Sequence, residues 1–169
     1  KVHVGDVGSD GKYALEFFNS PAYFYIRIIK ASEATLAAPT FKMLVVLGSL
    51  TESTATKTNV AVTPTTTAVA ILMEKAKADT TVDPVTFAND PANADSVAVL
   101  SQGLTDKIAA AAASETVNID EIASSTSLPV ISVALNKKTA TMSVGTTETL
   151  VAAVNPSFAT KTTAEWTSD

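Results

Sequence analysis

The sequence predicts a mainly β fold with a helical segment, of the α+β class, in which β-rich ends flank a helical middle. Apolar and polar residues alternate at 12–17 and again at 131–135, the pattern of strands with one buried face. Residues 64–78 instead place apolar side chains three and four positions apart, as on one face of a helix. We therefore expect three parts: part of a β-sandwich at 1–50, a helical segment and linker at 51–128, and a second β part at 129–169.

Composition and charge exclude several classes of function. Hydrophobic residues make up 46% of the 169-residue chain, enough for a packed core. The formal net charge of -5 argues against a nucleic-acid partner, because phosphate binding requires clustered Lys and Arg. Cysteine is absent, which removes disulfides and thiolate chemistry. No apolar run reaches the roughly 18–20 residues of a membrane helix, so the sequence predicts no membrane span.

Several strands are expected in the N-terminal part. An Asp-Gly pair in segment 9–12 indicates a tight turn, since these residues suit positive φ angles. It separates a short strand at 2–7 from an alternating strand at 12–17. Segment 23–30 also alternates, and segment 41–47 is almost wholly apolar, so we expect the latter to be a central strand.

The segment GSDGKYALEF at 8–17 resembles the hairpin of carboxypeptidase-regulatory-like β-sandwich domains. Such modules are structural attachments on many secreted bacterial proteins. The resemblance covers roughly the second half of such a domain and implies an incomplete β-sandwich at 1–50.

Helices are expected between the β-rich ends. A Thr-Pro pair begins segment 64–78 and an Asp-Pro pair begins segment 91–114, so both have a capping residue followed by a proline suited to the first turn. A shorter helix is expected at 119–123, whereas segment 79–87 is interpreted as a loop. Gly103 costs about 1 kcal/mol relative to Ala inside a helix, and we expect close packing against the first helix to explain it.

Residues 131–169 carry another run of short strands. Apolar residues alternate at 131–135, 140–144 and 150–154, and a fourth strand is expected to begin at 164–166. This segment is similar to group-2 bacterial immunoglobulin-like domains, the modules of intimin- and invasin-like surface proteins. The residues that fit the family pattern are Val133, Leu135, Asn136, Met142, Val144, Gly145, Leu150, Ala152, Val154, Pro156, Ala159, Trp166 and Ser168. The resemblance implies the start of an immunoglobulin-like β-sandwich and an extracellular or cell-surface location in bacteria.

The family pattern continues with further strands beyond the position of Trp166. A half-sandwich leaves unpaired strand edges and an uncovered core, which are costly in water. Two interpretations follow. The sequence is an excerpt of a longer chain, or the strands of one subunit are complemented by another subunit, as in donor-strand assemblies.

The chemistry available to the chain is limited. His3 is the single histidine, so without cysteine the usual catalytic triads and zinc sites cannot be built. Glutamates are scattered without a paired signature. Asp6 and Asp10 flank a turn and are the candidate calcium ligands, although no complete calcium-loop motif is present. We therefore predict no catalytic residues and no cofactor, with calcium as the one candidate ion.

Exposed aromatic residues are the candidate interaction surface. Tyr23 and Tyr25 alternate with apolar residues on the strand at 23–30 and share a face with Arg27, so we expect that face to be exposed or at an interface. Together with Trp166, they could form a carbohydrate site.

The predicted function is a non-enzymatic structural or adhesive component of a bacterial cell surface that self-assembles into a filament or layer by strand complementation. Its expected partners are other copies of itself or neighbouring domains of a longer chain. The alternatives are a module that binds carbohydrate or another ligand, and an accessory region of a larger secreted enzyme.

Overall fold

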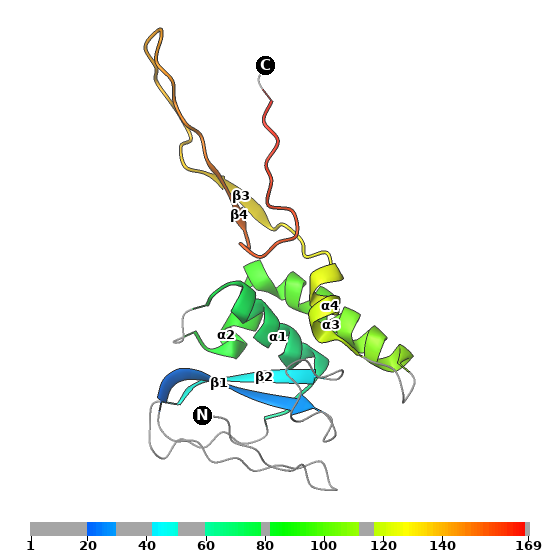
Figure 1. The fold of residues 1–169 in the computed structure, drawn as a ribbon. Coiled ribbons are helices and arrows are strands. Elements are labelled where there is room, and N and C mark those ends of the chain that lie inside the picture. Colours follow the sequence, from blue (N-terminus) through cyan, green and yellow to red (C-terminus); the bar gives the residue numbers. More distant parts are fainter. Residues whose placement is uncertain (1–19, 30–41, 51–59, 79–81, 112–116, 168–169) are drawn as a thin grey trace, which may run out of the picture.

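A computed structural model describes residues 20–29, 42–50, 60–78, 82–111 and 117–167, and the structural statements below concern these residues. The elements in chain order are β1 (Ser20–Ile29), β2 (Lys42–Leu50), α1 (Pro64–Lys75), α2 (Pro84–Asn89), α3 (Pro91–Ala110), α4 (Ile119–Ser125), β3 (Ser132–Leu135) and β4 (Ala152–Asn155). Figure 1 shows the helices on one side of the β1–β2 sheet, with the β3–β4 hairpin projecting from the opposite end of the helical layer.

The expectation of a mainly β fold with incomplete sandwiches is wrong. The helices contain 12, 6, 20 and 7 residues, against 10, 9, 4 and 4 for the strands. The described strands form two separate two-stranded antiparallel sheets. Alternation was correct for β1, β3 and β4, but it does not specify a second sheet to cover them, and here the helices supply the main core.

Two of the expected C-terminal strands do not form. Residues 140–144 and 164–166 lie outside regular strands, and Met142 and Val144 are exposed. A strand needs a hydrogen-bonding neighbour, and the described residues provide none for either segment. The strands expected at 2–7 and 12–17 lie outside the described residues.

Each helix begins at a side-chain cap. Thr63, Asp83, Asp90 and Asn118 each accept a hydrogen bond from a backbone N–H in the first turn. In the first three helices, a proline follows the cap, where its missing N–H costs nothing. The helices expected at 64–78 and 91–114 are therefore confirmed, although both end a few residues earlier.

The segment interpreted as a loop, 79–87, contains most of α2. Its Asp83-Pro84 start is the same signal that marks α1 and α3. The helix was missed because it has only 6 residues, of which Phe87 alone is buried, so no apolar periodicity could develop.

The core lies where α1 packs against both β2 and α3. Leu72 on α1 and Leu100 and Leu104 on α3 are fully buried in it. Ser96 is also fully buried, and its hydroxyl has no hydrogen-bond partner among the described residues. Burial of this apolar surface is the main stabilising contribution to the helical layer.

Strand β2 is buried on both faces. Val46 belongs to the helical core, while Val45 and Leu47 pack with Ile26 of β1 on the other face. Among the described residues, β2 pairs with β1 alone. On its other side, Thr67 Oγ1 accepts from the Leu44 N–H at 3.1 Å and donates to the Leu44 carbonyl at 2.9 Å. This buried hydroxyl of α1 therefore occupies a strand edge that would otherwise need a neighbouring strand.

Gly103 had been expected to pack against the first helix, but it packs near α4. A Cβ at this position would meet Thr126 Oγ1 at 3.5 Å and Ile122 Cγ2 at 3.8 Å, which are ordinary contacts. Helix α1 contacts α4 through Lys75, whose Nζ donates a hydrogen bond to the Ala123 carbonyl at 2.9 Å. A cation is favoured there because the carbonyls at the end of α4 carry partial negative charge.

Candidate interaction surface

The β3–β4 hairpin has one apolar face. Its register places Val133 opposite Val154 and Leu135 opposite Ala152, and directly opposed residues project from the same side of a sheet. Ile131 and Leu150 continue this alternation. The set Ile131, Val133, Leu135, Leu150, Ala152 and Val154 is called the hairpin face below.

Most of the hairpin face is exposed, whereas Ala152 and Val154 are half-buried. Val133 is 55% exposed and Leu135 is 47% exposed, although both occupy positions where the sequence pattern predicted burial. Ile131 and Leu150 are also exposed. A two-stranded hairpin is at best marginally stable in water unless its apolar face packs against something, so this surface is a candidate interaction site.

Polar contacts hold the hairpin together beyond its strands. The Asn136 side chain accepts from the Val151 N–H at 2.9 Å and donates to the Thr149 carbonyl at 3.3 Å. Lys137 forms an ion pair with Glu148. These contacts lie just beyond Leu135 and Ala152 and join the two arms of the hairpin past the end of its strands.

The base of the hairpin is fixed to the helical core. Leu128 is buried in that core, and its N–H donates to Thr160 Oγ1 at 2.7 Å. In return, the Thr160 N–H donates to the Leu128 carbonyl at 3.1 Å. Phe158 packs near Phe87 of α2, with ring centroids 6.4 Å apart. The hairpin is therefore anchored at its base and projects away from the helices (Figure 1).

A separate apolar groove lies between β2, α1 and α2. Its volume is about 210 Å³. The lining is mostly aliphatic, with Thr65, Thr66 and Asn89 as its polar members; the remaining lining residues are Val45, Val46, Val69, Pro84, Val85 and Ala88. Val85 is 66% exposed and forms an open lip. We call this space the β2–α2 groove.

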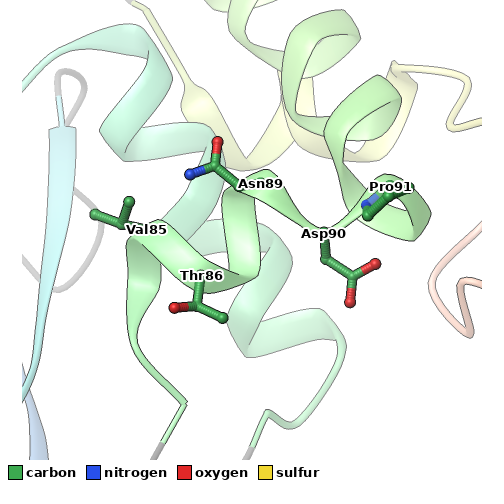
Figure 2. A pocket seen from close by; sticks show the side chains of 5 residues that line it. All are labelled: Val85, Thr86, Asn89, Asp90 and Pro91. Atoms are coloured by element: carbon green, nitrogen blue, oxygen red, sulfur yellow. The ribbon is translucent and has the colours of Figure 1, made fainter.

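A wider hollow of about 490 Å³ adjoins the groove along α2. Figure 2 shows its lining side chains, from Val85, Thr86, Asn89, Asp90 and Pro91. Val85 points toward β2, whereas Thr86 and Asp90 point away from the side that Asn89 occupies. The Asp90 carboxylate accepts from the Ala92 N–H as the cap of α3. These side chains do not converge on one point, as residues that act on one substrate atom would.

The predicted aromatic residues are not brought together. The backbone of Tyr23 pairs with Ser49 and that of Tyr25 with Val46, in the β1–β2 sheet. Trp166 is 54% exposed in the extended segment that follows the hairpin. Figure 1 places that segment and β1 at opposite ends of the molecule.

The candidate calcium ligands Asp6 and Asp10, like His3, lie outside the described residues. Within the described ranges, no three acidic, histidine or cysteine side chains gather as metal ligands would. The helices in that part of the chain are all too short or too polar to cross a membrane.

No protein family model, curated protein or solved structure matches this chain. Both candidate surfaces are therefore identified from the burial and contacts of their own residues. Sequence reasoning identified the apolar residues of the hairpin face but missed the β2–α2 groove, because α2 had been interpreted as a loop. The Asp83-Pro84 pair was the signal that could have revealed it.

Proposed function

We propose that this chain is a non-enzymatic structural or adhesive component of a bacterial cell surface, and that copies of it assemble into a filament or layer. The observation that carries the proposal is the exposed hairpin face on an anchored hairpin. An apolar surface held away from its own core by a fixed base is suited to complementation by another chain.

The location outside the cell rests on the resemblance of 131–169 to modules of bacterial surface proteins. The lack of cysteine is compatible with it but does not require it. The assembly part of the proposal is independent of location and can be tested with purified protein.

The test is sedimentation velocity of the 169-residue chain over a wide range of concentrations. We expect the unmodified chain to form larger species as concentration rises. The double variant Val133→Ser, Leu135→Ser should remain monomeric, since burying each side chain contributes about 1.5–3 kcal/mol. At 1.4 kcal/mol per tenfold change, losing both should weaken association by roughly a hundredfold or more.

The matched control is Val99→Ser, which removes an exposed valine of α3 outside both candidate surfaces. It should assemble like the unmodified chain. A chain that stays monomeric at all concentrations would contradict the proposal, as would a double variant that assembles as readily as the control.

A further inference from the structure

The part of the chain that the structure describes has two open apolar surfaces, the hairpin face and the β2–α2 groove. The hairpin extends away from β2 in Figure 1, so the hairpin of one chain does not cover the groove of that same chain. We propose that the β2–α2 groove of one copy receives the hairpin of the next copy. This inference rests on the proposed self-assembly and names the second surface that takes part in it.

The two surfaces match in apolar character. The valines Val46, Val69 and Val85 line the groove, and the hairpin presents Val133 and Leu135 as the most exposed large apolar residues of its strands. A space of about 210 Å³ is large enough for one or two aliphatic side chains and too small for a folded domain. The lip residue Val85 would then lose its exposure.

Beyond the part of its edge that Thr67 occupies, the main chain of β2 directs Val46 toward an incoming strand. Leu44 directs its N–H and carbonyl to the side of β2 that faces away from β1, where Thr67 binds both. The register is regular from Leu44 to Val46, so the main-chain groups of Val46 point to that same side. Val46 lines the groove, and an extended segment placed there can pair with it.

The charges of the two surfaces are complementary. Residues 82–94 contain Asp83 and Asp90 and no Lys or Arg. The hairpin, residues 132–155, carries Lys137 and Lys138 against the single acidic residue Glu148, which forms an ion pair with Lys137. A basic hairpin therefore approaches an acidic α2–α3 surface, whereas two hairpins approaching each other would bring like charges together.

A contact between two different surfaces is head-to-tail. Each copy that donates its hairpin still has an open groove, and each copy that fills its groove still has an open hairpin. Such contacts produce rings or open chains, in contrast to the closed dimer that a face-to-face pairing of two hairpins would produce. Head-to-tail contacts between hairpin and groove therefore favour a filament or a ring over a simple dimer.

Disulfide trapping tests the pairing directly, because the chain contains no cysteine. Two single variants, Val85→Cys in the groove lip and Val133→Cys on the hairpin face, are mixed and oxidised. We expect the mixed disulfide to form several-fold more than in a mixture of Val133→Cys with the control Val99→Cys. Either variant oxidised alone should give little dimer.

Strong self-crosslinking of Val133→Cys would show that the groove is not the partner surface. The same conclusion would follow if Val133→Cys formed equal amounts of mixed disulfide with Val85→Cys and with Val99→Cys. The sedimentation test on Val133 and Leu135 would still stand in either case, so failure of this inference is distinguishable from failure of self-assembly.

A double variant of the acidic surface tests whether charge orients the two copies. Asn caps helices about as well as Asp, so Asp83→Asn, Asp90→Asn removes two charges from the acidic surface and retains the caps of α2 and α3. We expect weaker association at low salt and a smaller loss of association when salt is added. Association with unchanged affinity and unchanged salt dependence would contradict the proposed orientation.

Discussion

The helical layer buries its apolar side chains, whereas the C-terminal hairpin leaves similar side chains exposed. Leu100 in α3 and Leu135 in β3 both occupy apolar positions of a clear periodic pattern. Leu100 is completely buried, whereas Leu135 is 47% exposed. Periodicity therefore marks which face of an element is apolar, and the presence of a second layer decides whether that face is buried.

The difference does not come from weak attachment of the hairpin. Leu128 and Thr160 join its base through reciprocal hydrogen bonds, and Phe158 packs against the core. The hairpin is held at one end and lacks a covering layer along its apolar face. This arrangement separates the part of the chain that stabilises the fold from the part that is available to a partner.

The largest expected effect compares one leucine from each region. Leu100→Ala should reduce the free energy of unfolding by about 3 kcal/mol, because it leaves a cavity in a packed core. Leu135→Ala should change it by less than about 1 kcal/mol in dilute monomer, since nearly half of that residue is already exposed to water. Urea denaturation at low protein concentration measures both. Equal losses would mean that the hairpin face is covered within the monomer.

A smaller effect tests how the helical layer protects its strand edge. Thr67→Val retains the shape of the side chain but leaves the Leu44 N–H and carbonyl without the hydroxyl that binds both. We expect a loss of about 1–3 kcal/mol in the same denaturation experiment. The control is Thr65→Val, because the Thr65 hydroxyl contacts Ser101 at an exposed position and should contribute less than about 0.5 kcal/mol. Similar losses for both variants would show that Thr67 has no special role.

The smallest effect compares two glycines. Gly103→Ala in α3 should stabilise the protein by about 0.5–1 kcal/mol, because alanine favours the helix and the space for a Cβ is present. Gly145 lies in the hairpin connection with φ of +87°, a conformation that alanine disfavours by about 1 kcal/mol.

Thermal unfolding reports on Gly103→Ala. Hydrogen exchange of the hairpin amides reports on Gly145→Ala, which should increase their exchange. A lower unfolding temperature for Gly103→Ala would show that α3 and α4 pack too closely for a methyl group.

Local signals in the sequence predicted the helix starts well. The Thr-Pro and Asp-Pro pairs before α1 and α3 bind backbone N–H groups of the first turn, an interaction that depends on adjacent residues alone. The same signal before α2 was present but was outweighed by the shortness of that segment. For this reason the groove that α2 lines could not be predicted.

Non-local contacts explain what the sequence could not reveal. Thr67 lies 23 residues from Leu44, and no local pattern indicates that its hydroxyl binds a strand edge. Gly103 was expected to pack against the first helix, whereas α4 is its neighbour. Both contacts depend on how the elements fold together in three dimensions.

The sequence by itself determined where the helices begin, which face of each element is apolar, and that 131–135 and 150–154 form extended chain that can pair. These properties follow from caps, prolines and side-chain periods, which act over a few residues. The tertiary structure alone decided that helices cover β2 while the described chain leaves most of the hairpin face exposed. Burial depends on which surfaces the whole chain brings together, so the same alternation produces a core in one region and an open surface in the other.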